Sequence, residues 1–485
     1  MDHGQDMLTK RVLRKLDYHV LPPIALLWLA NFLDRSNIGN ARISGLERDT
    51  HLHGNQFNTA LAVFYITYII VEVPSNAILK KFKANASRWI ALLVLVWGIV
   101  TTLTGLVQNY AGLLAVRLCL GLCEGGLLPG MVLYLSSMYK RHELQIRIGV
   151  FYAAVSLSGA FGGLLATAIS KMDGVGGLAG WRWIFILEGL ATILASLVAG
   201  YVLPADLNSA SFFTEEEKAH ALWRFQNDNS PIFKEDASDM PPILNDAEEF
   251  EWREIKRGVL DVQTWLTGLA FFGQLVSLYS YSFFLPTIIT GLGYSGTRAQ
   301  LYTVPPYVPA AALTVIVAYF SDKLKLRGPF ILVCLPLTIV GYIISIAAQT
   351  NKARYAAVFL IAAGIYPSGP CMLSILANNT SGHYKRATAT ALQTTIANLS
   401  GFLATFAYTP VDQAPEYIRG HSIALAFVIF AWIMVAANVT YCMWENKARR
   451  EGRRDYHITK YEKLRVSGKT RAPIGDRHPG FMFTL

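Results

Sequence analysis

The chain carries little charge for its length. Only 16% of its 485 residues are Asp, Glu, Lys or Arg, whereas 53% are hydrophobic. Soluble proteins carry about 25% charged residues. Mean hydropathy is positive as well. The composition therefore excludes an ordinary soluble protein of this size and indicates an integral membrane protein.

Cysteine is also scarce, and all of it lies within long apolar stretches. The five residues are Cys119, Cys123, Cys334, Cys371 and Cys442. This placement argues against an extracellular disulfide framework. We interpret Cys119 and Cys123, four residues apart on one helix face, as packing residues rather than a metal or redox pair.

Motifs of catalysis and cofactor binding are absent from the sequence. There is no His-Glu-x-x-His, no Gly-x-Ser-x-Gly and no cluster of metal ligands. The glycine-rich stretch from Gly174 to Gly180 lacks the strand context and the lysine of a phosphate-binding loop. We expect no enzyme activity, no cofactor and no metal. The polar, basic first 17 residues also give no sign of a cleavable signal peptide.

Apolar stretches of about 20 residues, long enough to cross a bilayer, recur along the chain. We predict twelve transmembrane helices, at about 18–39, 56–80, 88–107, 110–138, 146–171, 181–203, 262–290, 299–321, 329–348, 354–378, 386–409 and 421–444. A polar loop separates the sixth from the seventh. The fold class is therefore all-α integral membrane, with two six-helix bundles.

The predicted parts of the chain follow from this division. They are an N-terminal tail (1–17), an N-terminal bundle (18–203), a central loop (204–260), a C-terminal bundle (261–444) and a basic C-terminal tail (445–485). Within the central loop we predict a helix from Thr214 to Gln226, with Thr214 and Glu217 forming a capping box.

Basic residues gather in every second loop and in both tails, and the alternate loops contain few. The net charge is +10. By the positive-inside rule, both termini and the central loop are cytoplasmic. The dense run after Trp444 lies beside a membrane span, which favours contact with anionic lipid headgroups over nucleic acid.

Four charged residues interrupt the predicted spans: Asp34, Arg35, Arg117 and Glu124. A charge at mid-bilayer costs roughly 3 kcal/mol, so it persists there mainly when it is paired or faces a watery cavity. Arginine can grip a carboxylate through two parallel hydrogen bonds, and a carboxyl group can carry a proton. Together these residues are typical of a proton-coupled anion carrier.

Longer motifs around these charges resemble the major facilitator superfamily, specifically its anion:cation symporter branch and the fungal allantoate and nicotinate permeases. The motifs are Leu33-Asp-Arg-Ser-Asn-Ile-Gly-Asn-Ala41, Pro74-Ser-Asn-Ala-Ile-Leu-Lys80, Arg117-Leu-Cys-Leu-Gly-Leu-Cys-Glu-Gly125, and Gly180-Trp-Arg-Trp-Ile-Phe185 followed by Glu188-Gly189. The resemblance covers nearly the whole chain. It departs from the family in the loop between helices 2 and 3, where Lys80-Lys-Phe-Lys83 replaces an acidic pattern. The better match, with Asp322 and Arg327, lies between helices 8 and 9.

The resemblance implies roles for the charged residues. Asp34, Glu124 and Arg117 would couple protons, with Asp34 paired to Arg117. Arg35 would contact the substrate anion, and Arg117 belongs to the same predicted substrate site. In the C-terminal bundle, the predicted substrate-binding residues are Gln274, Tyr279, Gln393 and Asn398. We interpret the remaining membrane acids, Glu72 and Glu188, as structural.

We therefore expect a permease that imports a small organic anion, such as a vitamin or nitrogen-source acid, with protons. The alternatives are an exporter or uncoupled facilitator, and a transporter-like membrane sensor. We expect a monomer in the plasma membrane, with the vacuolar or another internal membrane as the alternative.

Overall fold

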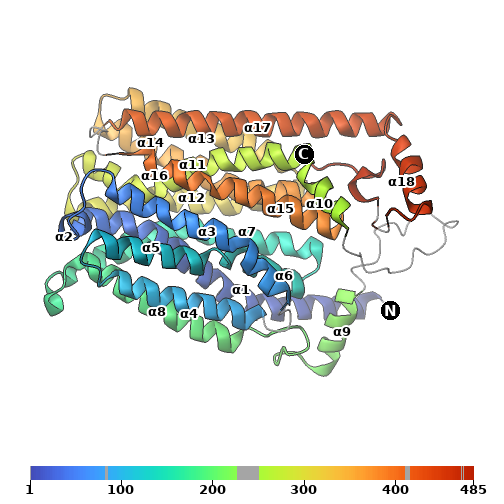
Figure 1. Cartoon of the computed structure of the whole chain (residues 1–485), viewed down its shortest axis with the longest axis horizontal. Helices are drawn as coiled ribbons and strands as arrows, with labels where there is room; N and C mark the ends of the chain where they lie inside the picture. The colour runs from blue at the N-terminus through green and yellow to red at the C-terminus, as the bar shows by residue number, and fades with distance from the viewer. Residues whose placement is uncertain (1, 82–85, 227–250, 410–415, 471, 473) are drawn as a thin grey trace.

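The computed structural model describes the chain except for residues 1, 82–85, 227–250, 410–415, 471 and 473. The loop between helices 2 and 3, with Lys83, and much of the central loop lie outside the described residues. Long helices run side by side along the molecule and form two bundles, one from each half of the chain (Figure 1).

The N-terminal bundle contains six predicted spans. It consists of α1 (Asp2–Ala41), α3 (Gln56–Lys81), α4 (Ala86–Thr104), α5 (Tyr110–Glu124) with α6 (Leu127–Met138), α7 (Arg141–Ile169) and α8 (Gly180–Val202). Short helical turns follow α1 and α7: η1 (Arg42–Leu46), α2 (Glu47–Asp49), η3 (Ser170–Met172) and η4 (Val175–Gly177).

The C-terminal bundle contains the other six. It consists of α11 (Val262–Gly291), α12 (Gly296–Leu324), α13 (Gly328–Ala347), α14 (Asn351–Asn379), α15 (His383–Asn398) with α16 (Ser400–Ala407), and α17 (Ile418–Arg450). Outside the bundles lie α9 (Glu215–Gln226), α10 (Trp252–Val259), α18 (Tyr456–Val466) and η6 (Gly475–Arg477). The predicted all-α fold of two bundles is confirmed.

Eight of the described helices are long and apolar enough to cross a membrane by length and composition. The other spans include α3, whose apolar part is the shorter stretch Gln56–Glu72, and two spans that are broken into shorter helices. The fourth predicted span breaks between α5 and α6 at Gly125 and Gly126, and the eleventh breaks at Leu399.

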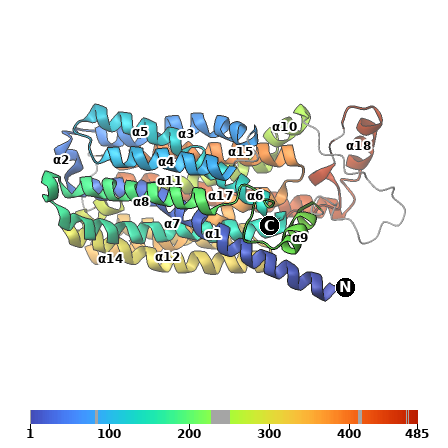
Figure 2. The ribbon, with the colours of Figure 1, turned by 90° about the horizontal axis from the view of Figure 1, so that it is seen from below.

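Two predicted boundaries differ from the structure. The first helix starts at Asp2, so nearly all of the predicted N-terminal tail is helical and extends beyond the bundle (Figure 2). The last span continues to Arg450, which brings several basic residues of the predicted tail into α17. The helix in the central loop is confirmed as α9. Its capping box forms as well, because Thr214 N donates to Glu217 Oε2 (3.0 Å) and Glu217 N donates to Thr214 Oγ1 (3.3 Å).

The two bundles meet along α7 and α12, and along α1 and α11. Glycines allow the close approach of α7 to α12. A Cβ atom added at Gly159 would lie 2.3 Å from the Tyr307 ring, and one at Gly163 would lie 2.5 Å from Thr303 Oγ1. Both termini lie toward the end of the molecule that carries α9, α10 and α18, which we call the α9 end (Figure 1). The opposite end carries α2 and is called the α2 end.

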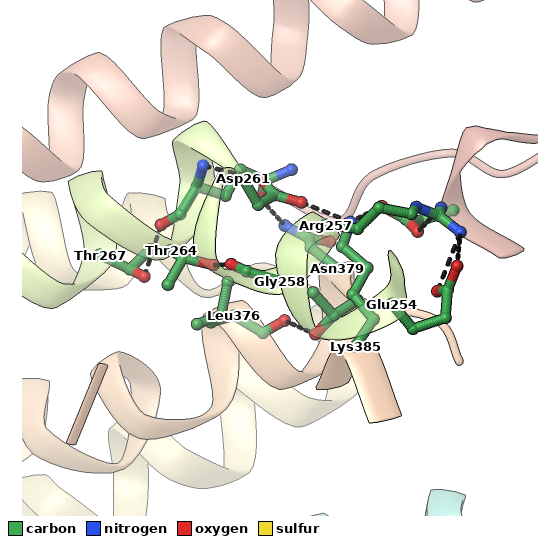
Figure 3. A network of polar contacts seen from close by, with 12 residues as sticks. Glu254, Arg257, Gly258, Asp261, Thr264, Thr267, Leu376, Asn379 and Lys385 are labelled. Atoms are coloured by element: carbon green, nitrogen blue, oxygen red, sulfur yellow. Dashed lines mark hydrogen bonds and ion pairs between the residues drawn. The ribbon is translucent and has the colours of Figure 1, made fainter. Parts of the chain in front are cut away.

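At the α9 end, the segment from Thr470 to Leu485 closes a buried ionic network. Asp476, which is 4% exposed, contacts Arg257 of α10 (3.3 Å) and also Lys385 of α15. Arg257 pairs in turn with Glu254, and Lys385 Nζ donates to Asp261 at 2.5 Å (Figure 3). The network joins the central loop, two helices of the C-terminal bundle and the tail.

Asp476→Asn should lower the free energy of unfolding by about 3 kcal/mol, because removing one partner of a buried ion pair leaves the opposite charges uncompensated. Thermal unfolding of the purified protein in detergent measures this loss. The matched control is Glu451→Gln, which removes an exposed partner of Lys447 and Arg453 and should change stability by less than about 0.5 kcal/mol. Equal stability of the two variants would contradict the prediction.

Candidate functional site between the two bundles

The C-terminal part of α1 carries several buried polar and charged residues. Asn31, Asp34, Arg35, Asn37 and Asn40 are all less than one tenth exposed. Asp34 and Arg35 are adjacent, so their side chains diverge by about 100° around the helix. Asp34 accordingly faces α4, and Arg35 faces α5 and α11. The sequence order therefore sends the two charges in different directions.

Arg35 is the centre of the site. Its side chain is 7% exposed and contacts both bundles, because Nε donates to Glu124 Oε2 (3.3 Å) and Nη1 donates to the Tyr279 hydroxyl (3.2 Å). Four aromatic rings surround the guanidinium, with their centroids 5.1–5.7 Å from Cζ: Phe32, Phe64, Tyr68 and Tyr279. Aromatic faces attract a cation, which helps to offset the burial of the arginine.

Glu124 lies at the last position of α5, beside the break at Gly125 and Gly126. Its Oε2 accepts hydrogen bonds from Asn31 Nδ2 (2.7 Å) and from Arg35. Close packing of α5 on α3 depends on glycine. A Cβ atom at Gly121 would lie 2.1 Å from Thr67 Oγ1, and one at Gly125 would lie 2.4 Å from the Tyr68 carbonyl oxygen. The glycines thus allow this part of α5, with Glu124, to lie close against the bundle.

Asp34 and Arg117 do not form the direct ion pair that the family resemblance implied. Asp34 Oδ2 instead accepts from Trp97 Nε1 (2.9 Å) and Thr101 Oγ1 (3.3 Å), both on α4. Arg117 is 4% exposed, and its Nε and Nη2 have no hydrogen-bond partner among the described residues. The two groups are still close enough to interact electrostatically. The Trp97 indole and the Thr101 hydroxyl therefore bond to Asp34 where the Arg117 guanidinium was expected.

Asp34→Asn and Arg117→Gln should damage stability non-additively, by a coupling energy of about 1 kcal/mol, because each buried charge partly compensates the other. The double variant should be no less stable than the poorer single variant. A double-mutant cycle on thermal stability in detergent measures this. Pairing Asp34→Asn with Arg42→Gln, near the α2 end, is the control and should be additive. Additive losses for Asp34 and Arg117 would show that these two residues are not coupled.

In the C-terminal bundle, only Tyr279 among the predicted substrate residues contacts Arg35 directly. Gln274 Nε2 donates to the Ile365 carbonyl (3.1 Å) and to Ser368 Oγ (2.7 Å), so it links α11 to α14. Gln393 Nε2 donates to the Met372 carbonyl (3.2 Å), also on α14. Both glutamine amide nitrogens are therefore engaged within the C-terminal bundle in this structure.

Asn398 reaches the other bundle, but at a different place. Its Nδ2 donates to Glu72 Oε2 (3.1 Å) on α3. This contact lies between the bundles, and the structural role of Glu72 stays a prediction. The hydrogen bond from Asn398 also explains how Glu72 is tolerated two residues before Pro74, because the Glu72 carboxylate has a buried amide partner.

Several residues of the site escaped the sequence reasoning. Asn31, Trp97, Tyr65 and Tyr68 all contact the charged residues or their aromatic neighbours. A signal for Asn31 was present, because it precedes Arg35 by four residues and so shares its helix face. The aromatic residues carried no such signal, since tyrosine and tryptophan in spans usually pack or lie at interfaces. In the loop between α12 and α13, Arg327 pairs with Asp322 as the motif there suggested.

Comparison with known proteins shows the family of the chain. The model of the Major Facilitator Superfamily matches residues 24–405, most of the chain. The chain belongs to the major facilitator superfamily. It is a multi-pass membrane transporter, and its relatives and fold are those of transporters rather than of enzymes.

Curated relatives within the superfamily are fungal. The chain is 38% identical to an uncharacterized transporter of Schizosaccharomyces pombe, over 91% of this chain and 85% of the relative. It is 35% identical to the high-affinity nicotinic acid transporter of Saccharomyces cerevisiae, over 91% of this chain and 80% of that protein. These matches confirm the superfamily and the resemblance to fungal permeases.

Solved structures of the superfamily share the fold at low identity. A partially occluded, inward-open xylose transporter from E. coli superposes with a TM-score of 0.65 at 14% identity, covering 86% of this chain and 97% of that one. A bacterial homologue of the human lysosomal transporter Spinster gives 0.62 at 17% identity, covering 87% and 96%. Superfamily transporters bind their substrates between two halves, and in this chain Arg35 and Tyr279 join the two bundles.

Proposed function

We propose that the protein imports a small organic anion together with protons. The observation that carries this proposal is the buried contact between Arg35 and Glu124, with Tyr279 of the other bundle on the same guanidinium. A buried cation can hold a substrate carboxylate bidentately. The neighbouring carboxyl group can take up the proton.

Glu124 and the substrate carboxylate compete for Arg35, and this competition couples substrate binding to protonation of Glu124. While Glu124 is ionised, it occupies the guanidinium, and a substrate carboxylate must displace it. When Glu124 is protonated, Arg35 is left without a full counter-charge, so an incoming anion restores the balance. Substrate and proton therefore favour each other's binding, which is reciprocal by thermodynamic linkage.

The surroundings of Arg35 support a carboxylate attached to a flat ring, without excluding other acids. The rings of Phe64, Tyr68 and Tyr279 surround the guanidinium, and aromatic rings attract one another as well as cations. The 35% identical nicotinic acid transporter points the same way. A vitamin or nitrogen-source carboxylate fits this description.

Contacts between the bundles support an alternating-access mechanism. At the α2 end, Asn58 Nδ2 donates to the carbonyl oxygens of Thr405 (2.5 Å) and Tyr408 (2.8 Å), and Gln300 Nε2 donates to Ser44 Oγ (2.9 Å). If the α9 end is cytoplasmic, as the basic residues indicate, these bonds hold the outer side closed. They would break and re-form as the two bundles rock around the central site.

The same orientation places both tails at the cytoplasmic surface of the plasma membrane, or of the vacuole or another internal membrane. Lys447, Arg450 and Arg453 are exposed on and after the last helix, where they can contact anionic lipid headgroups. Arg449 and Arg454 are instead engaged by Glu445. We propose that the protein works as a monomer, since each chain contains a complete pair of bundles.

Uptake into proteoliposomes containing the purified protein tests this proposal. A panel of labelled acids, including nicotinate and aliphatic carboxylates, is offered with the outside more acidic than the inside. We expect accumulation of at least one acid that collapses when a protonophore is added. Equilibration without accumulation would indicate an uncoupled facilitator, and accumulation in the opposite direction an exporter. Binding without any transport would indicate a membrane sensor.

A further inference from the structure

Glu188 is a buried acid of the N-terminal bundle for which the proposed coupling has no role. It lies on α8, which packs against α1 and α4. Its Oε2 accepts a hydrogen bond from Asn37 Nδ2 on α1. Asn37 follows Asp34 by three residues and so lies on the same side of α1, about one turn further along. Glu188 and Asp34 are close enough to interact electrostatically.

Both of these acids have a buried oxygen without a hydrogen bond. Glu188 Oε1 and Asp34 Oδ1 are inaccessible to solvent and have no partner among the described residues. Their other oxygens are satisfied by Asn37, Trp97 and Thr101. A buried acceptor left without a donor destabilises the protein, and two neighbouring carboxylates disfavour each other's ionised form. A proton on one of the two acids removes this repulsion and turns one of the unpaired oxygens into a donor.

The charges of the cluster indicate which acid carries that proton. Asp34, Glu124 and Glu188 contribute three carboxyl groups, while Arg35 and Arg117 contribute two permanent positive charges. Arg35 bonds to Glu124, and Arg117 is within electrostatic range of Asp34 and Glu124. Glu188 contacts the side-chain amide of Asn37 and lies within electrostatic range of the Asp34 carboxyl group. With Glu188 neutral, the cluster has no net charge, which is the least costly state inside a membrane.

Groups on the other elements that pack around α8 do not alter this count. On α4, the side chains that face the cluster are Trp97 and Thr101, which are uncharged. Of the charged α7 side chains that the structure describes, Glu143 pairs with Arg224 and Arg147 pairs with Asp17 near the α9 end. In η1, Arg42 pairs with Glu47. On α8 itself, Arg182 donates to the Gly105 carbonyl (3.1 Å).

We propose that Glu188 keeps a proton throughout the transport cycle and acts as a positioning residue that holds Asn37 of α1. This proposal rests on the proposed proton-coupled import. It has a consequence for stoichiometry. The resident proton on Glu188 does not move, and Asp34 keeps its charge near Arg117 in place of the coupling role that the resemblance implied. Only Glu124 then exchanges a proton with solvent. A monovalent anion then enters with one proton, and no net charge crosses the membrane.

The first test needs no variant. Proteoliposomes receive either a pH gradient or a potassium diffusion potential set with valinomycin, and uptake of a transported monocarboxylate is measured. We expect the pH gradient to drive accumulation and the potential, imposed at equal pH, to drive none. Accumulation driven by the potential at equal pH would overturn the inference while leaving proton-coupled import intact. If neither gradient drives accumulation, it is the proposed function that fails.

Two variants then test the position of the proton. Glu188→Gln keeps an uncharged group whose carbonyl oxygen can still accept from Asn37, so its pH profile of uptake should match that of the wild type. Glu188→Ala leaves Asn37 without this partner, and we expect roughly a tenfold or greater loss of uptake with a shifted pH profile. Rescue by glutamine supports the inference. Loss of pH-driven accumulation in a monodisperse Glu188→Gln protein would overturn it, because the exchanging proton would then be on Glu188.

Discussion

Arg35→Lys is expected to lower substrate affinity by about 10- to 100-fold, although the positive charge is retained. Lysine cannot present the planar fork that grips a carboxylate with two bonds. Its ammonium also cannot reproduce the contacts that Arg35 makes with Glu124 and Tyr279 at once. The loss is measured as the concentration dependence of uptake, or as the ligand-induced thermal shift of the purified protein.

Arg42→Lys is the matched control for this change. Arg42 also lies over aromatic rings, with Phe57 at 4.5 Å and Phe284 at 5.8 Å, and pairs with Glu47 at 2.9 Å. It lies in η1, away from the contact between Arg35 and Tyr279, so its replacement should leave affinity unchanged. Near-normal affinity in Arg35→Lys would mean that Arg35 does not hold the substrate.

Glu124→Gln is expected to abolish proton-driven accumulation and to leave exchange of substrate across the membrane. Glutamine resembles the protonated carboxyl permanently, so Arg35 stays available to the anion, but no proton can be released. The carbonyl oxygen of the amide can still accept from Asn31, which limits structural damage. Counterflow in proteoliposomes measures exchange, and uptake under a pH gradient measures accumulation.

Glu47→Gln serves as its control, since it neutralises the acid of the comparable Arg42 pair outside the centre of the protein. It should retain full accumulation. If Glu124→Gln accumulates substrate as well as the wild type does, the exchanging proton is carried by another residue, and the competition for Arg35 does not explain coupling.

Most of the fold could be predicted from the sequence because lipid imposes simple constraints. A span needs about 20 apolar residues, and every described backbone segment that crosses is a helix, as a lipid environment requires. The positions of all twelve predicted spans agree with helices. The breaks after Glu124 and at Leu399 were not foreseen, because hydropathy does not record where helices approach closely enough to interrupt one another.

The charged residues of the site were predictable for the same reason, whereas their partners were not. Asp34, Arg35, Arg117 and Glu124 stand out because charge is costly in hydrocarbon. Which group each one contacts depends on helix rotation by a few tens of degrees, and this is set by packing. The rotation of α1 places Asp34 beside Trp97, which donates a hydrogen bond to it, and not in an ion pair with Arg117. Packing likewise turns Gln274 and Gln393 toward α14 and away from the neighbouring bundle.

The ionic network around Asp476 has a consequence for how the protein is made. Asp476 follows Arg257 by 219 residues and Lys385 by 91. Ribosomes add about 5–20 residues per second, so Lys385 waits roughly 5–20 s for this partner. During that interval the C-terminal bundle holds cations whose final counter-charge has not yet been synthesised. Replacing the chain from Thr470 onward with a reporter domain would therefore remove Asp476, which completes the network. The cell would then treat the incompletely folded transporter as a substrate for quality control.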